Sequence, residues 1–140
     1  MTPVVVDASV AMKWFVPEGL SPEAVRLLDG GFELMAPDLL FPEFGNVLWK
    51  KISRREIPPA EGPAILAGLG KIPFVVIAAA PLLEAALEIA LATRRTVYDS
   101  LYVAAAVSRD CTLVTADDRL VRAFAGGPLA PHVRSLSQGV

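Results

Sequence analysis

The segment VVVDASVAM, residues 4–12, predicts the first strand of the fold and ends that strand on a carboxylate. Three β-branched residues in a row, at positions 4–6, are typical of a short buried strand. Asp7 stops the apolar run, and Ser9 follows two residues later. A carboxylate in this position either caps the helix that follows or belongs to a functional site at the end of the strand.

The rest of the chain repeats this alternation of short apolar runs and helical patterns. Further strands are expected at residues 32–36, 74–78 and 112–115, with a weaker fifth at 132–136. Helical patterns are found at residues 21–31, 41–56, 64–70, 81–95, 97–110 and 118–124. Ser21 is expected to be the N-cap of the first of these helices. The order predicts an α/β domain, a three-layer sandwich around a central, mainly parallel sheet of four to five strands.

Length and composition favour a single domain over residues 1–140 with a large core, because 54% of the residues are hydrophobic. The single cysteine, Cys111, cannot form an intramolecular disulfide, which points to a reducing compartment and a buried thiol. The longest apolar stretch, residues 72–83, is interrupted by two prolines and is shorter than the about 20 residues that span a bilayer. We therefore expect a cytoplasmic protein without a membrane segment.

The formal net charge of −2 gives no global positive field that would attract nucleic acid. Basic residues nevertheless gather at two places, and such clusters are either solvated helix ends or contacts for phosphate groups. The candidates for phosphate contacts are Lys50, Lys51, Arg54, Arg55, Arg94 and Arg95.

Four acidic residues occupy comparable positions near the ends of strands or the starts of helices. Asp7 directly follows a strand and Asp117 comes just after one, whereas Glu43 and Asp99 lie in the first turns of helices. Each of them can be explained as a residue that stabilises a helix N-terminus, typically by ~0.5–1 kcal/mol. However, Asp99 opens one of the most apolar helices of the chain, and capping does not require such burial.

The alternative is that the four carboxylates converge at one end of the sheet. Two unit charges 4 Å apart repel by about 4 kcal/mol at an effective dielectric constant of 20, so protons or divalent cations must relieve such a cluster. All-oxygen ligands favour Mg²⁺ or Mn²⁺, and one or two such ions can activate water against a phosphodiester. Ser9 and Thr115 either orient these ligands or make ordinary turn hydrogen bonds.

Four segments, VVVDASV, PEFGNVLWK, TVYDSLYVAAAV and LVTADDRL, together resemble the motifs of the PIN domain family, and within it the toxin nucleases of VapC-type toxin–antitoxin modules. The resemblance extends from about residue 4 to residue 121. It implies a Rossmann-like sheet and a Mg²⁺- or Mn²⁺-dependent endoribonuclease that cleaves RNA. It also implies a homodimer and inhibition by a small cognate antitoxin, and the apolar composition is consistent with a surface that either partner covers.

The resemblance also implies roles for individual residues. The acidic ligands would be Asp7, Glu43, Asp99 and Asp117, and the supporting polar positions would be Ser9 and Thr115. Asp118 stands beside the fourth acid at a position where the family varies, so its role stays open. His132, the sole histidine, lies outside every motif and is expected to be structural.

Two other classes of protein share an α/β fold with clustered acids. A phosphorylated receiver domain needs adjacent acids after the first strand and a lysine after the last, but Ala8 follows Asp7 and no lysine follows Lys71. A PIN-like module that binds RNA or a protein without cutting it is the second alternative. The intact set of acids argues against such a module, and metal-dependent activity would discriminate between the two.

Overall fold

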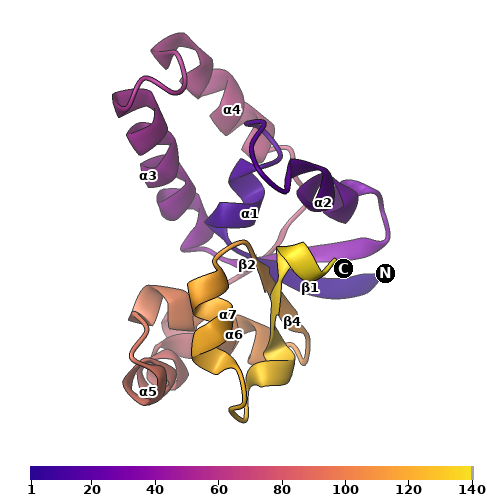
Figure 1. Ribbon diagram of the computed structural model, residues 1–140, viewed down its shortest axis with the longest axis vertical. Helices are drawn as coiled ribbons and strands as arrows, with labels where there is room; N and C mark the ends of the chain where they lie inside the picture. The colour runs from indigo at the N-terminus through magenta and orange to yellow at the C-terminus, as the bar shows by residue number, and fades with distance from the viewer. Residues whose placement is uncertain (140) are drawn as a thin grey trace.

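The computed structural model describes residues 1–139, which fold around one central five-stranded sheet (Figure 1). Its strands are β1 (Thr2–Val6), β2 (Phe32–Pro37), β3 (Val75–Ile77), β4 (Thr112–Thr115) and β5 (Val133–Ser135). The spatial order is β3-β2-β1-β4-β5, and each neighbouring pair is parallel. The expected parallel sheet of four to five strands is confirmed, and the weak fifth strand is its edge.

Helices connect the strands in the expected order. They are α1 (Ala8–Met12), α2 (Ser21–Val25), α3 (Leu40–Ser53), α4 (Gly62–Leu69), α5 (Leu83–Thr93), α6 (Val97–Ser108) and α7 (Asp118–Phe124). Short 3₁₀ turns follow or precede several of them, at Arg26–Leu28, Pro59–Glu61, Ala80–Leu82, Ala130–His132 and Leu136–Gln138. Within residues 1–139, no helix has both the length and the apolar character that a membrane crossing requires.

The two faces of the sheet carry separate cores, as its alternating side chains require. Val5 of β1 packs with α6, α3 and α7 in one cluster. Val4 and Val6 pack with residues of α2 and the adjoining turn, Ala24 and Leu27, in the other. Figure 1 accordingly shows α2 on one side of the sheet and α5 and α6 on the other. This arrangement is the three-layer sandwich that the sequence predicts.

The strand order determines where a site can form. The chain runs from β1 outward to β2 and β3, and then returns to the other side of β1 to form β4 and β5. Val6, the last residue of β1, pairs with Val114 of β4, so the carboxyl ends of these two strands are neighbours. Parallel sheets bind ligands at such a switch in strand order. Asp7 and Asp117 are therefore brought to the same edge of the sheet.

Two helices frame this edge. The α3 helix extends away from the sheet beside α4 (Figure 1), and its buried side chains Leu40, Phe44 and Leu48 anchor it to the core. The α6 helix is buried from Ser100 to Ala106, as its apolar sequence predicts, and its outer side is covered by α5. Both α3 and α6 begin near the carboxyl edge of the sheet, so their first turns are presented there.

Ser21 does not have the predicted capping role. The N-cap of α2 is Leu20, which has a left-handed φ of 68° and makes no side-chain capping bond. The hydroxyl of Ser21 instead accepts a hydrogen bond from the Glu18 amide at 3.0 Å and donates one to the Val16 carbonyl at 3.3 Å. The serine therefore closes the loop before the helix, because its side chain faces back along the chain.

Candidate active site

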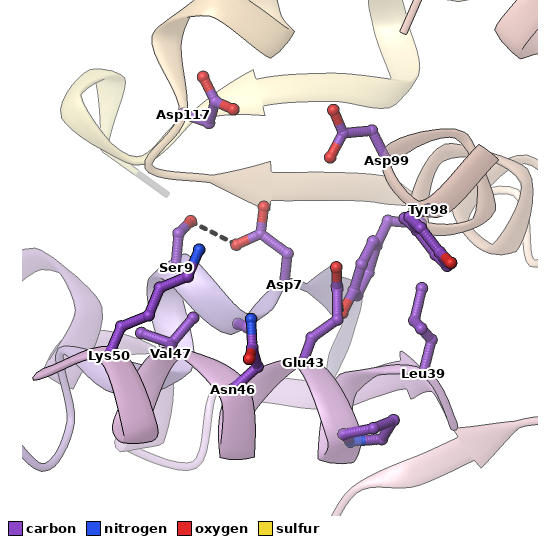
Figure 2. A pocket seen from close by; sticks show the side chains of 13 residues that line it. Asp7, Ser9, Leu39, Glu43, Asn46, Val47, Lys50, Tyr98, Asp99 and Asp117 are labelled. Atoms are coloured by element: carbon purple, nitrogen blue, oxygen red, sulfur yellow. Dashed lines mark hydrogen bonds between the residues drawn. The ribbon is translucent and has the colours of Figure 1, made fainter. Parts of the chain in front are cut away.

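A cavity of about 490 Å³ opens at the carboxyl edge of the sheet, and all four predicted acids line it. Figure 2 shows their side chains pointing toward a common space. They come from four separate parts of the fold: Asp7 follows β1, Glu43 is in the first turn of α3, Asp99 is in the first turn of α6, and Asp117 follows β4. The fold thus brings together carboxylates that are up to 110 positions apart in the sequence.

Asp7 is the most enclosed of the four, with 8% of its surface exposed. One carboxylate oxygen accepts hydrogen bonds from the Ser9 hydroxyl and from the Val10 amide, the latter at 3.2 Å. The hydrogen bond from Val10 caps α1. The other oxygen accepts a hydrogen bond from the Thr115 hydroxyl. The capping interpretation is therefore correct for Asp7, and the same side chain also faces the cavity.

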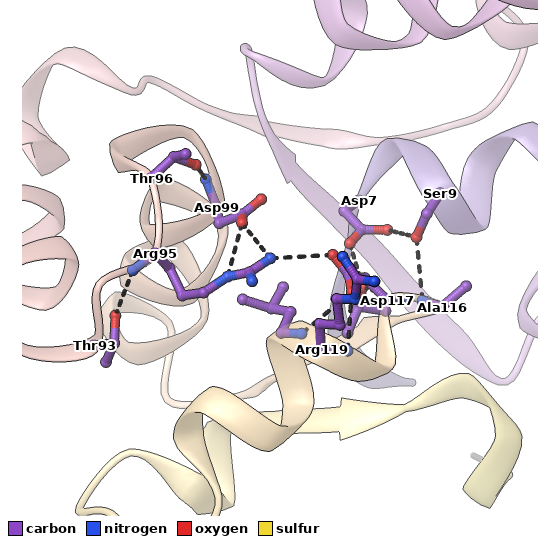
Figure 3. Close-up of polar contacts among 11 residues, drawn as sticks. Asp7, Ser9, Thr93, Arg95, Thr96, Asp99, Ala116, Asp117 and Arg119 are labelled. Carbon is purple, nitrogen blue, oxygen red and sulfur yellow. Dashed lines mark hydrogen bonds and ion pairs between the residues drawn. The ribbon is translucent and has the colours of Figure 1, made fainter.

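Ser9 and Thr115 connect the ends of β1 and β4 through these bonds, and Figure 3 shows Ser9 beside Asp7. The Ser9 hydroxyl also accepts a hydrogen bond from the Ala116 amide at 3.1 Å. The Thr115 hydroxyl accepts one from the Asp117 amide at 3.1 Å. Each hydroxyl thus joins the Asp7 carboxylate to the backbone that carries Asp117, which restricts the orientation of both acids.

Burial is the main cause that raises the pKa of Asp7 above the usual value of a carboxyl group. Hydrogen bonds from Ser9, Thr115 and Val10 oppose this shift of the pKa, and the negative charge of Asp117 adds to it. The neutral form of Asp7 is therefore favoured more than in a free carboxyl group. Protonation is one of the two ways, beside cation binding, in which repulsion among the clustered carboxylates can be reduced.

Asp117 also has a double role. Its Oδ1 accepts hydrogen bonds from the amides of Arg119 at 3.0 Å and Leu120 at 3.2 Å, which cap α7. Its Oδ2 faces the guanidinium of Arg95. The neighbouring Asp118 is exposed and does not line the cavity. It accepts a hydrogen bond from the hydroxyl of Ser135 at 2.8 Å instead.

Glu43 is held by a residue that the sequence analysis did not identify. The buried hydroxyl of Tyr102 donates a hydrogen bond to Glu43 Oε1 at 2.6 Å. Burial raises the pKa of Glu43, the Tyr102 hydrogen bond opposes that shift, and the charges of Asp7 and Asp99 add to it. Burial and the Glu43 carboxylate also raise the pKa of Tyr102, so the phenol stays a proton donor. Tyr102 lies three residues after Asp99 on the same face of the helix, and this spacing is the feature of the sequence that could have identified it.

Arg95 makes the ion pairs of this cavity (Figure 3). Its Nε and Nη2 donate to Asp99 Oδ2 at 3.2 and 2.9 Å, and Nη2 also lies 3.3 Å from Asp117 Oδ2. The preceding residue, Arg94, ends α5 with a left-handed φ of 61°, and this turn directs the chain toward α6. Arg95 was predicted to contact phosphate, whereas in the structure it bridges two of the acids.

The other predicted basic contacts have different surroundings. Lys50 lines the cavity together with Asn46, and both lie on the α3 face that carries Glu43 (Figure 2). The ammonium group of Lys51 pairs with Glu18 at 2.9 Å. The remaining three, Arg54, Arg55 and Arg94, are exposed and do not line the cavity. Lys50 and Arg95 are therefore the two predicted basic residues that the fold places at the acids.

The donor atoms of the cavity have the chemistry that Mg²⁺ and Mn²⁺ prefer, since four carboxylates from rigid elements face one space. Their spacing is more open than a ligand shell. Within residues 1–139, no group of three or more His, Cys, Asp or Glu side chains is gathered closely enough to hold one metal ion. The set therefore fits a hard cation by donor type, and two of its members are joined by Arg95 instead.

His132 lies away from this cavity. Its Nδ1 is 2.8 Å from the carbonyl oxygen of Cys111, at the start of β4, and the ring is partly buried. Cys111 is buried in the core, and burial raises the pKa of its thiol. Both side chains contribute to packing beside the sheet, as the sequence suggests.

Comparisons with known proteins identify a matching family model and similar proteins. The family model described as PIN domain matches residues 4–125. Ribonuclease VapC3 of Pyrobaculum aerophilum is 35% identical over 123 residues, which cover 86% of this chain and 94% of that protein.

Solved structures share the fold at lower identity. The sarcin-ricin loop cleaving toxin VapC20 of Mycobacterium tuberculosis superimposes with a TM-score of 0.65 at 18% identity, covering 86% of this chain and 94% of that one. A toxin–antitoxin complex from Klebsiella pneumoniae superimposes with a TM-score of 0.59 at 13% identity, covering 95% of this chain and 97% of that one.

Proposed function

The chain belongs to the PIN domain family, and on this premise we propose that it is a metal-dependent endoribonuclease, the toxin of a type II toxin–antitoxin pair. The observation that carries the proposal is the convergence of Asp7, Glu43, Asp99 and Asp117 in one cavity at the switch in strand order. Helix capping explains Asp7 and Asp117 singly, but it does not require four carboxylates to face the same space.

The similarity to ribonuclease VapC3 supports the choice of RNA as substrate, because it extends over nearly the whole of both chains. The similarity to VapC20 concerns the fold alone, at 18% identity. Hydrolysis of an RNA phosphodiester requires that its charge be neutralised beside a source of activated water. The acidic donors of the cavity suit that purpose only if a cation binds among them.

The cofactor of the proposed reaction is Mg²⁺ or Mn²⁺, as one or two ions, and its ligands would be Asp7, Glu43, Asp99 and Asp117. When bound, such an ion neutralises phosphodiester charge and makes water a better nucleophile.

Side chains of this chain hold the acidic residues and the substrate in position. Ser9 and Thr115 fix the Asp7 carboxylate, and Tyr102 fixes Glu43 through its 2.6 Å hydrogen bond. Lys50 and Asn46 present donor groups on the α3 side of the cavity, where they can hold the phosphate of the substrate.

Two protein partners complete the proposal. A small cognate antitoxin would inhibit the enzyme, and the shared fold with a protein of the Klebsiella toxin–antitoxin complex supports this assignment. A second copy of this chain would form a homodimer. Exposed leucines at regular intervals on α5, Leu83, Leu87 and Leu91, offer a surface for that contact.

The test of the proposed activity is cleavage of an end-labelled structured RNA by the purified protein. We expect cutting with Mn²⁺ or Mg²⁺, none with EDTA, and a loss of at least about 100-fold in Asp99→Asn, which removes a ligand charge at nearly constant shape. A control variant, Asp38→Asn, changes an aspartate outside the cavity lining and should cut at the wild-type rate.

Absence of cutting on several RNAs, with or without metal, would contradict the proposal. RNA binding that persists under those conditions would favour a PIN-like module that binds without catalysis. Cutting that survives EDTA and Asp99→Asn would instead place the activity outside this cavity.

A further inference from the structure

We propose that Arg95 is a resident counter-cation of the acidic cavity, which holds Asp99 and Asp117 in the metal-free protein and competes with the divalent cation for them. The inference rests on the proposed function, because it concerns how this site receives its metal. It assigns Arg95 a different role from the phosphate contact that its position in the sequence suggests.

The geometry places the guanidinium between two carboxylates from different elements. Arg95 Nη2 is 2.9 Å from Asp99 Oδ2 and 3.3 Å from Asp117 Oδ2, and Nε adds a second bond to Asp99 at 3.2 Å. Within residues 1–139, two ion pairs involve carboxylates of the cavity, and Arg95 makes both of them. The bridge therefore joins the start of α6 to the end of β4 in place of a metal ion.

The charges explain why a cation is needed there. The cavity is lined by four carboxylates, and like charges at short distances repel strongly when they are partly removed from water. Asp99 and Asp117 are only partly exposed, and the guanidinium lies at the carboxylate oxygens of both. A guanidinium does not deprotonate in proteins, so it stays a counter-charge at any working pH.

The same contacts make Arg95 a competitor. Its hydrogen bonds occupy Oδ2 of Asp99 and Oδ2 of Asp117, and the Oδ1 atom of Asp117 already caps α7. Both oxygens of Asp117 are thus engaged, so a divalent cation that binds Asp117 must compete either with the guanidinium or with the α7 cap. This agrees with the open spacing of the acids, since within the described chain no three of them are gathered around one point.

Displacement is feasible because the bridge is only partly enclosed. The side chain of Arg95 is 25% exposed and those of its two partners are 30% and 39% exposed. Ion pairs of this exposure are weak, so a doubly charged cation with well-placed oxygens can replace the guanidinium. Arg95 therefore lowers the metal affinity of the site while it preserves the arrangement of the acids in the metal-free state.

The experiment measures Mn²⁺ binding by isothermal titration calorimetry and by the loss of the free-ion electron paramagnetic resonance signal. The proteins are metal-free wild type, Arg95→Gln and Arg94→Gln. The last is a matched control, because it removes the same charge from the adjacent, exposed residue. We expect Arg95→Gln to bind Mn²⁺ about 3- to 10-fold more tightly than wild type, and Arg94→Gln to bind within about twofold of wild type. Circular dichroism checks that each variant is folded, and Arg95→Lys, which keeps the charge, should bind less tightly than Arg95→Gln.

Equal or weaker Mn²⁺ binding by folded Arg95→Gln overturns the inference and leaves the proposed metal dependence intact, provided that wild type binds. An equal gain in Arg94→Gln also overturns it, because the effect would then be one of overall charge. No Mn²⁺ binding by any of the proteins would overturn the inference together with the metal dependence on which it rests.

Discussion

The four cavity carboxylates are held by neighbours of three chemical kinds. Asp7 accepts hydrogen bonds from Ser9 and Thr115, Glu43 accepts one from Tyr102, and the remaining two share Arg95. Three kinds of contact thus stabilise one acidic cluster: hydroxyl donors, a buried phenol and a guanidinium. Two of its members, Asp7 and Glu43, also have a raised pKa, caused mainly by burial.

The raised pKa of Glu43 predicts how stability depends on pH in the metal-free protein. Folded Glu43 holds its proton more tightly than unfolded Glu43, so this contribution is present below the usual carboxyl pKa and is lost as the pH rises through the raised value. Glu43→Gln removes the titration, and its amide oxygen can still accept the hydrogen bond from Tyr102. In urea titrations with EDTA, we expect the free energy of unfolding of the variant to fall less steeply with rising pH than that of wild type.

The control for this prediction is Glu88→Gln, which neutralises an exposed glutamate on α5. Its pH dependence should follow that of wild type. Identical slopes for wild type and Glu43→Gln would show that the carboxyl of Glu43 gains no proton affinity on folding, and would contradict the account of its burial.

At the level of residues, the sequence predicts which acids line the cavity better than it predicts their hydrogen-bond and ion-pair partners. The positions of Asp7 and Asp117 follow from strand ends, which local patterns reveal. The pairing of Arg95 depends on the tertiary approach of α6 to the end of β4, and no local pattern encodes that distance. The clustered acids in the sequence suggest relief by protons or metal ions, and the side chain of Arg95 supplies a third form of relief.

Among the elements, α3 carries one wall of the cavity, and α4 lies beside α3 where both extend from the sheet. Two glycines in these helices differ sharply in their surroundings. A Cβ added at Gly45 in α3 meets no other atom within 4 Å, whereas one at Gly68 in α4 would lie 2.6 Å from Cε1 of Phe15. The Phe15 ring itself packs edge-on against the buried Phe44, with centroids 5.9 Å apart, so it cannot move freely.

These surroundings predict opposite effects of the same substitution. Gly45→Ala should raise the free energy of unfolding by ~0.5–1 kcal/mol, because alanine is the better helix former in open space. Gly68→Ala should lower it by ~1–3 kcal/mol, because the methyl group displaces a packed ring. Chemical denaturation measures both values. A stabilising Gly68→Ala would contradict the packing of α4 against Phe15.

The elements themselves are the part of the fold that the sequence predicts best. Runs of β-branched residues locate β1 and β4, and charge at both ends locates α3. The error at Ser21 has a physical cause, because serine satisfies loop groups and helix ends by similar hydrogen bonds. Which of these a serine makes depends on the path of the loop before it.

For the whole molecule, the apolar sequence leaves leucines of α5 uncovered. Leu83, Leu87 and Leu91 recur every four residues along one face of the helix and are at least half exposed. The opposite side of α5 packs on α6 through Ala86. A narrow apolar stripe of this kind can meet the same stripe of a second copy across a two-fold axis.

We therefore predict that wild type sediments as a dimer at micromolar concentration and that Leu87→Glu sediments as a monomer. Leu66→Glu is the matched control, since Leu66 on α4 is 48% exposed compared with 51% for Leu87. It should remain dimeric. A monomeric wild type would contradict the homodimer, and a dimer that Leu66→Glu dissociates but Leu87→Glu does not would place the interface on the α3–α4 side.

The overall topology could be predicted as a class but not in its order. Alternating strands and helices indicate a parallel sheet, and right-handed crossovers restrict its connections. The placement of β4 beside β1, on which the cavity depends, comes from packing of the two cores and is absent from any single motif. The family resemblance implies a Rossmann-like sheet, which is a class of topology without a stated strand order.

The central claim is that convergent carboxylates, and not acidity in general, make this cavity an active site. Asp117 and Asp118 are adjacent in sequence, but Asp117 lines the cavity and Asp118 does not. The most direct measurement is the rate at which Asp117→Asn and Asp118→Asn cleave the same end-labelled RNA in Mn²⁺. The account predicts a loss of about 100-fold or more for Asp117→Asn and a rate within about threefold of wild type for Asp118→Asn. Equal rates for the two variants would contradict it.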